Sequence, residues 1–61
     1  MYQNFEKIIT SKGIKPSDVS KATGIATSTL SDWKTGKTTP KADKLIKIAK
    51  YLDTTVEELM G

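Results

Sequence analysis

Residues 16–36 read PSDVSKATGIATSTLSDWKTG, and their apolar side chains fit two short amphipathic helices joined by a sharp turn at Gly24-Ile25. Gly24 permits the turn, because a residue that ends a helix in the left-handed conformation is usually glycine, which has no Cβ to clash there. Ser20 is small enough for the two helices to cross at roughly 90–120°. Four apolar residues then converge on one buried seam: Val19, Ile25, Leu30 and Trp33.

The second of these helices, at about residues 27–35, carries its polar groups on the side opposite the seam. Leu30 and Trp33 are spaced i, i+3, so we expect both in the core. The residues that face outward are hydrogen-bonding groups without bulk: Thr27, Ser28, Ser31 and Asp32. This helix is therefore predicted to end at Gly36 with a small, polar outer face.

The segment before the turn predicts one further helix, at about residues 2–12, that stops at Gly13. Its apolar positions are Phe5, Ile8 and Ile9. Pro16 then opens the next helix, because the missing N–H of proline costs nothing in a first turn.

Two further helices are expected after Gly36. Lys37–Thr39 form a loop, and the helix after Pro40 has one apolar stripe at 3.6-residue spacing. The stripe consists of Ala42, Leu45, Ile46, Ala49 and Leu52. Thr55-Val56-Glu57-Glu58 is a capping-box pattern that starts a short last helix. No stretch alternates as a strand does, so the sequence predicts an all-α fold with five helices.

Length and composition restrict the function. The 61 residues suit one domain, 1–61, near the lower size limit for folding without disulfides or metal. Cysteine and histidine are absent, which removes disulfides, zinc fingers and catalysis by either residue. We expect no enzyme activity, no metal and no cofactor. Because no apolar run approaches the roughly 20 residues of a membrane span, and MYQNFEK is too polar for a signal peptide, we expect a cytoplasmic protein.

Charge is distributed unevenly, although the net charge is only +3. Residues 1–31 carry a net charge of +2, residues 32–50 carry six lysines against Asp32 and Asp43, and residues 51–61 carry a net charge of −3. The basic charge therefore lies beside and after the helix at 27–35. This layout fits a polyanionic partner. The charge distribution alone fits equally well with lysines that are simply solvated residues on the exposed faces of the helices.

Over essentially its whole length the chain resembles the Cro and lambda-repressor type of helix-turn-helix domain, the XRE family. The matching features are Gly13, Val19, Gly24-Ile25, Leu30 and Trp33, the run WKTGK, Pro40, LIKIAKYL and TTVEELMG. The resemblance implies a compact five-helix lambda-repressor-like bundle that docks its third helix in the major groove of double-stranded DNA. It also implies a homodimer on a palindromic operator, a role as a transcriptional repressor or regulator, and a nucleoid-associated location.

The resemblance also assigns the contacts. The base-facing positions are Thr27, Ser28 and Asp32, with Ser31 beside them. Hydroxyls donate to or accept from base edges, and a carboxylate accepts from cytosine N4. The phosphate-binding positions, which fix register without reading sequence, are Thr35, Lys37, Thr38 and Lys41. All ten basic residues are lysine, so recognition lacks the two-pronged arginine contact to guanine and depends on hydroxyls, Asp32, water and DNA shape.

Several positions depart from the family pattern. Ala26 stands where a serine or threonine N-cap is common, which leaves open that Thr27 or Ser28 caps the helix instead of contacting bases. Pro16 stands where a glutamine often holds a phosphate. Ser17 or the backbone amides of that first turn replace it, since a helix N-terminus attracts phosphate.

Two further departures explain each other. Ile9 and Lys34 occupy positions where the family often has a buried ion pair, so apolar packing of Ile9 near Trp33 replaces the pair. Lys34 is then free to contact the DNA backbone. The alternative is a solvated lysine favoured by the helix dipole.

Two other classes of function stay open. One is an enzyme that uses a desolvated lysine in a cleft with partner groups, to which nothing in the sequence points. The other is a protein-binding module of the same fold, of the antitoxin or anti-repressor type. Apolar residues on the outer face of the helix at 27–35 would favour it, and the polar face favours DNA. Homodimerisation is expected through the last helix, where Val56, Leu59 and Met60 fit either core or dimer surface, or through a missing C-terminal domain. The chain then corresponds to the N-terminal head of a longer repressor.

Overall fold

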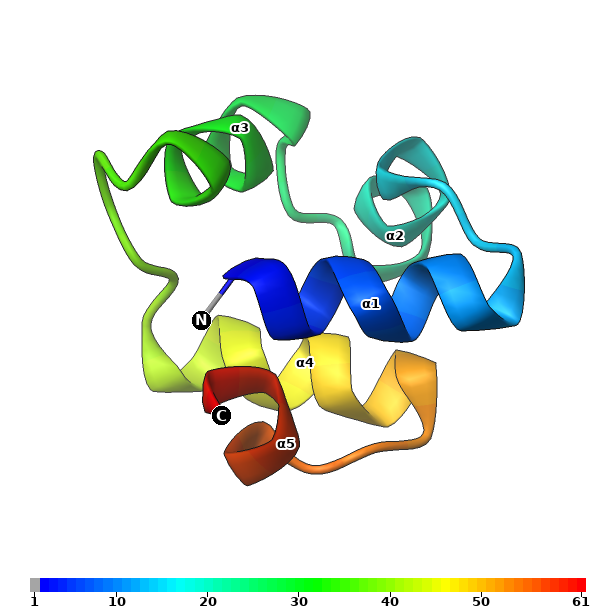
Figure 1. Cartoon of the computed structure of the whole chain (residues 1–61). Coiled ribbons are helices and arrows are strands. Elements are labelled where there is room, and N and C mark those ends of the chain that lie inside the picture. Colours follow the sequence, from blue (N-terminus) through cyan, green and yellow to red (C-terminus); the bar gives the residue numbers. More distant parts are fainter. Residues whose placement is uncertain (1) are drawn as a thin grey trace.

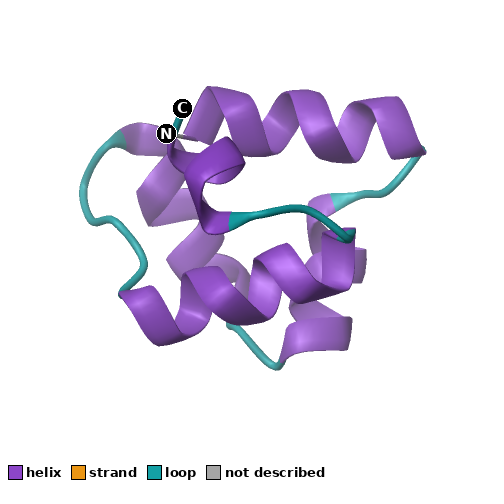
Figure 2. Cartoon of the chain, turned by 90° about the horizontal axis from the view of Figure 1, so that it is seen from below, coloured by secondary structure: helices purple, strands orange, loops and turns teal. Residues whose placement is uncertain are grey.

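The structure, a computed structural model, describes residues 2–61 and consists in this range of α-helices joined by short loops (Figure 1, Figure 2). The helices are α1 (Tyr2–Lys12), α2 (Pro16–Thr23), α3 (Thr27–Thr35), α4 (Ala42–Leu52) and α5 (Val56–Met60). Residues 2–61 contain no strand. The prediction of an all-α, five-helix fold is therefore confirmed. None of these helices has both the length and the apolar character needed to cross a lipid bilayer.

The helix α1 runs through the middle of the molecule, with α2 and α3 on one side and α4 and α5 on the other (Figure 1). It packs against α3 and α5, while α2 packs against α3 and α4, and α4 packs against α5. The inner side of α3 is therefore held by α1 and α2, and its outer side faces solvent.

Apolar side chains from all five helices form one core, and Trp33 of α3 lies at its aromatic end with only 2% of its surface exposed. Its ring centroid is 5.5 Å from that of Tyr2, with the rings nearly perpendicular at 89°, and 5.2 Å from that of Phe5. Such edge-to-face and tilted pairs are favourable arrangements of aromatic rings. The expectation that Trp33 belongs to the core is confirmed. Ile9 is buried in the same cluster.

The predicted apolar stripe of α4 is wrong at two positions. Ile46 is 46% exposed and Ala42 is also exposed, whereas Ile48, absent from the predicted stripe, is completely buried. The buried side of α4 consists of Leu45, Ile48, Ala49 and Leu52. These positions follow i, i+3, i+4, i+7, and Ile46 lies one residue, about 100°, around the helix from Leu45.

The turn between α2 and α3 is held by glycine and by hydroxyl groups. Gly24 has φ +76°, in the left-handed region, and its N–H donates to the carbonyl of Ser20 at 2.9 Å. The Ser20 hydroxyl donates to the carbonyl of Ile25 at 2.5 Å, and the N–H of Ile25 donates to Thr23 Oγ1 at 3.3 Å. These bonds fix the direction in which the chain enters α3.

The last helix, α5, begins as its capping pattern predicts, with one change of partner. Thr55 Oγ1 accepts a hydrogen bond from the N–H of Glu58 at 3.1 Å. The Glu58 carboxylate accepts from the hydroxyl of Thr54 rather than completing the reciprocal bond to Thr55. Leu59 is completely buried, Val56 is half-buried against the core, and Met60 is 37% exposed. Of these three residues, Met60 is the most accessible to a partner.

Candidate nucleic-acid interface

The outer face of α3 presents small polar groups to solvent. Thr27, Ser28 and Ser31 are exposed, and Asp32 is half-buried, while Leu30 and Trp33 of the same helix are buried. At about 100° per residue, Ser28 and Asp32 lie on one flank of the exposed face and Thr27 and Ser31 on the other. The structure thus places all four predicted base-facing residues on the outside of α3, in two adjacent rows.

The start of α3 leaves its first polar residues available. Ala26 is the N-cap, with φ −61° and ψ 143°, and no side chain among the described residues caps the helix. The N–H groups of Thr29 and Leu30 donate to the carbonyl of Ala26. Thr27 is therefore the first helical residue, and the alternative that Thr27 or Ser28 serves as the N-cap is wrong.

The end of α3 and the following loop are shaped by Gly36, which has φ +80°. The N–H of Lys37 donates to the carbonyl of Asp32 at 2.8 Å, and that of Gly36 donates to the carbonyl of Trp33 at 3.1 Å. This pair of bonds is a Schellman ending. It holds the loop against the helix, so that the exposed side chains of Lys37 and Thr38 project from the end of α3.

The predicted phosphate contacts of this loop differ in what they can donate. The Thr35 hydroxyl donates to the carbonyl of Asp32 at 3.1 Å, and the N–H of Thr38 points to the same oxygen at 3.4 Å. Both groups must turn away from Asp32 before they can donate to a phosphate. The ammonium groups of Lys37 and Lys41 need no such change, because both residues are exposed. Lysine is also the more suitable partner for a phosphate by charge.

Lys41 and Ser17 both lie at helix starts that have a lysine N-cap and an aspartate in the first turn. Lys41 is the N-cap residue of α4, where the exposed amides of the first turn add partial positive charge. Ser17 is the exposed second residue of α2, but the carboxylate of Asp18 accepts a hydrogen bond from the N–H of Lys15 at 3.1 Å in the same turn. A phosphate at the start of α2 would meet this carboxylate. The start of α4 also carries an aspartate in its first turn, Asp43, so the two helix starts are alike in charge.

A hollow of about 180 Å³ brings three of the predicted residues together beside α3. It is lined by Tyr2, Pro16, Thr27, Leu30, Ser31 and Lys34. The three predicted residues follow i, i+4, i+7 along one flank of α3, a spacing visible in the sequence. Tyr2 was missed, because nothing local in the sequence indicates that the first residue of α1 packs beside α3.

The hydroxyl of Tyr2 is held in its neutral form. Burial, and secondarily the negative charge of Glu6, raises the pKa of Tyr2 above the ordinary value of 10.0. Burial disfavours the charged form of any acid, and a nearby carboxylate adds to the effect. Tyr2 therefore loses its proton only at a more alkaline pH than an ordinary tyrosine does.

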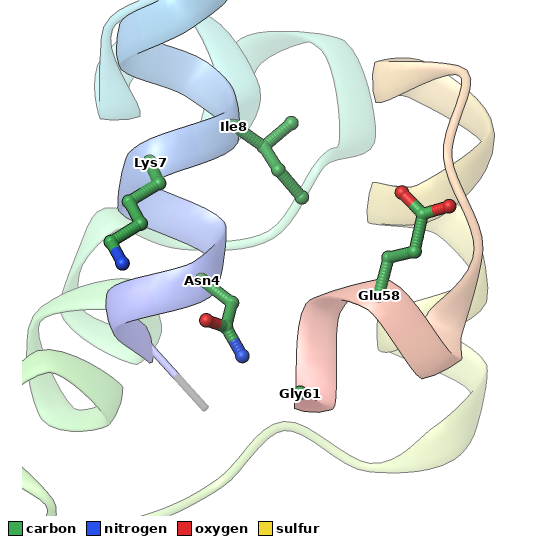
Figure 3. Close-up of a pocket in the computed structure, with 5 residues that line it drawn as sticks. All are labelled: Asn4, Lys7, Ile8, Glu58 and Gly61. Carbon is green, nitrogen blue, oxygen red and sulfur yellow. The ribbon is translucent and has the colours of Figure 1, made fainter.

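A second hollow lies between α1 and α5. It is lined by Asn4, Lys7 and Ile8 of α1 and by Glu58 and Gly61 at the end of the chain (Figure 3). The side chain of Asn4 reaches toward Gly61 in this view (Figure 3). None of these five residues is among the predicted DNA contacts, so this hollow is separate from the face of α3.

The chain matches the family model of the Cro/C1-type HTH DNA-binding domain over residues 4–61. It belongs to this family. In this Cro/C1-type domain, α2, the turn at Gly24 and α3 form the helix-turn-helix. The members of this family are DNA-binding domains. Comparisons with curated proteins and with solved structures gave no significant match.

Proposed function

We propose that this Cro/C1-type domain is a sequence-specific transcriptional repressor that places α3 in the major groove of a palindromic operator. The observation that carries the proposal is the outer face of α3, where small hydrogen-bonding side chains are exposed and lysines follow at once in the next loop. Small hydroxyls let the helix approach base edges closely, and the lysines reach the flanking phosphates.

Within α3, Ser28 and Asp32 are the main candidates for base reading, with Thr27 at the start of the helix and Ser31 beside them. A carboxylate close to DNA is repelled by phosphates, so Asp32 is tolerable only if it gains a specific partner. The cytosine N4 amino group is such a partner, because it is a donor in the major groove. Thr27 offers a hydroxyl and a methyl group, which suits thymine as well as a polar edge.

The backbone contacts are proposed for the lysines around the end of α3: Lys34, Lys37 and Lys41. Lys37 and Lys41 bracket the loop between α3 and α4, which lies at one edge of the molecule (Figure 1). Thr35, Thr38 and Ser17 supply weaker, uncharged contacts. Without arginine, each half-site is expected to bind modestly, and a homodimer supplies the rest of the affinity.

The dimer is proposed to form through α5 or through a C-terminal domain beyond this chain. Exposed Met60 is the apolar group that α5 offers to a second copy. A two-fold dimer of helix-turn-helix domains reads two half-sites about 10 base pairs apart.

The rival function, a protein-binding module, would need apolar groups on the outer face of α3. The large exposed apolar side chains of residues 2–61 are Ile46, Tyr51 and Met60, which belong to α4 and α5. Nothing on the outer face of α3 therefore favours a protein partner over DNA.

The proposal is tested by selecting bound duplexes from a random pool. We expect an enriched motif with two-fold symmetry and a complex of two chains per duplex in sedimentation. Ser28→Trp should abolish binding at an unchanged melting temperature, because the indole blocks the outer face of α3. Ser11→Trp, at an exposed position of α1, is the matched control and should bind normally. Failure to enrich any duplex, even at low salt, would contradict the proposal.

A further inference from the structure

Most of the residues that line the hollow beside α3 carry a hydrogen-bond donor in the side chain. Of these lining residues, Tyr2, Thr27 and Ser31 each carry a hydroxyl and Lys34 carries an ammonium, while Pro16 and Leu30 are apolar. No acidic side chain is among its lining residues. Glu6 lies near enough to influence Tyr2. The carboxylate of Asp18, two residues from Pro16, accepts a hydrogen bond from the N–H of Lys15. The volume of about 180 Å³ is several times the roughly 30 Å³ that one water molecule occupies in the liquid. This chemistry suits an anion with several acceptor oxygens.

Tyr2 is held in place in this hollow by its own ring. Only 9% of the residue is exposed. Its ring centroid lies 5.5 Å from the ring centroid of Trp33 and 5.5 Å from that of Phe5. A side chain fixed in this way loses little conformational freedom when it binds a ligand. The exposed remainder of Tyr2 therefore acts as a positioned donor rather than a mobile one.

In the proposed complex, the hollow lies beside the DNA backbone. Its walls are α3, which enters the groove in the proposed complex, and Pro16 at the start of α2, the helix that crosses the backbone in this docking geometry. The DNA strand on the side of the groove that faces Pro16 therefore passes the opening of the hollow in the proposed complex.

We infer that Tyr2 is a DNA contact of this chain and that it holds one backbone phosphate in the hollow together with Ser31 and Lys34. The inference rests on the proposed function. It adds one contact residue, Tyr2, and the position of one phosphate, neither of which the proposed function assigns. Tyrosine and serine hydroxyls are common donors to phosphate oxygens. In this arrangement Ser31 contacts the backbone instead of a base. It positions the helix together with Lys34, and Ser28 and Asp32 on the other flank of α3 read the bases.

The test is Tyr2→Phe, which deletes the hydroxyl and keeps the ring against Trp33. We expect Kd to rise about tenfold on every duplex sequence, as for the loss of one hydrogen bond to a charged group. The ranking of sequences, the melting temperature and the salt slope should stay unchanged, because the lost group is neutral. Tyr51→Phe, on α4 and 40% exposed, is the matched control and should leave Kd unchanged.

Duplexes with a single neutral methylphosphonate locate the contact. At one position per half-site the substitution should weaken the wild-type domain and make Tyr2→Phe cause no further loss. If the wild-type domain binds its selected duplex and Tyr2→Phe binds equally well, the phosphate contact is wrong and the proposed function stands. A loss of affinity that accompanies a lower melting temperature, or persists on every methylphosphonate duplex, would also overturn the contact. If the wild-type domain binds no duplex, the proposed function fails and this contact with it.

Discussion

The hydroxyl of Ser20 in α2 donates a hydrogen bond to the carbonyl oxygen of Ile25, 2.5 Å away, across the turn that leads into α3. The sequence indicated Ser20 only for its small size at the helix crossing. The structure adds that its hydroxyl satisfies a carbonyl in a part-buried place. Ser20 therefore sets both how close the helices approach and in which direction α3 leaves the turn.

Ser20→Ala should destabilise the domain by about 1–3 kcal/mol, because the Ile25 carbonyl loses its donor in a place that water reaches poorly. Urea unfolding measures the change. Ser11→Ala is the matched control, since the Ser11 hydroxyl also donates to a carbonyl, that of Ile8 at 2.8 Å, but at the exposed surface. We expect a cost within about 0.5 kcal/mol there. Equal costs for the two variants would mean that the Ser20 bond has no special role.

Trp33→Ala should unfold or nearly unfold the domain. Truncation of a buried aromatic side chain costs about 3–5 kcal/mol, and the free energy of unfolding of a small domain is little larger than that. Trp33→Phe should cost less than half as much. Its ring still packs on Tyr2 and Phe5, and the indole N–H that it removes has no hydrogen-bond partner among the described residues. Thermal melting checks both variants. A Trp33→Ala domain that melts normally and no longer binds DNA would make Trp33 a surface contact instead.

The free energy of unfolding should fall at high pH because the phenol of Tyr2 loses its proton. Its pKa is raised in the folded state, so the folded state prefers the neutral phenol. The neutral phenol of Tyr2 contributes fully to the free energy of unfolding below the pKa of about 10 that Tyr2 has in the unfolded chain. This contribution is lost as the pH rises toward the pKa of Tyr2 in the folded state. Chemical unfolding between pH 8 and pH 11 should therefore show the wild-type domain losing more stability than Tyr2→Phe at about pH 10 and above. Parallel pH profiles for the two proteins would contradict the assignment.

Asp32→Ala should relax sequence preference at one base pair of each half-site. The carboxylate is expected to discriminate one base by about 1–3 kcal/mol, whereas the rest of the face is unaltered. Titration of single-base variants of the selected duplex gives the profile. A uniform change across all variants would reduce Asp32 to a helix-end or solvent role.

The start of α2 and the ends of α2 and α3 were predictable because a local signal fixes each of them. Gly24 and Gly36 occupy left-handed conformations at the ends of α2 and α3, and Pro16 begins α2. A glycine or proline acts on its own turn, so no knowledge of distant residues is needed.

The features that escaped prediction depend on distant parts of the chain. Ile46 and Ile48 are both apolar, and which of them is buried depends on how α4 is rotated against its neighbours. Tyr2 reaches the flank of α3 only because α1 packs there, more than 20 residues away in sequence. The positions of Thr27, Ser28, Ser31 and Asp32 on the outside of α3 were predictable from helical spacing, whereas their individual partners on DNA remain predictions.

The central claim, that the exposed side of α3 and its following loop bind DNA, is tested most directly by the salt dependence of duplex binding. Lys37→Ala removes an ammonium from the loop after α3, and Lys12→Ala removes one from the far end of α1 (Figure 1). For the wild-type domain, the logarithm of affinity should fall linearly with the logarithm of salt concentration. Lys37→Ala should flatten that slope by roughly one unit and keep the ranking of sequences, while Lys12→Ala should leave the slope unchanged. The same steep slope for both variants would contradict the account.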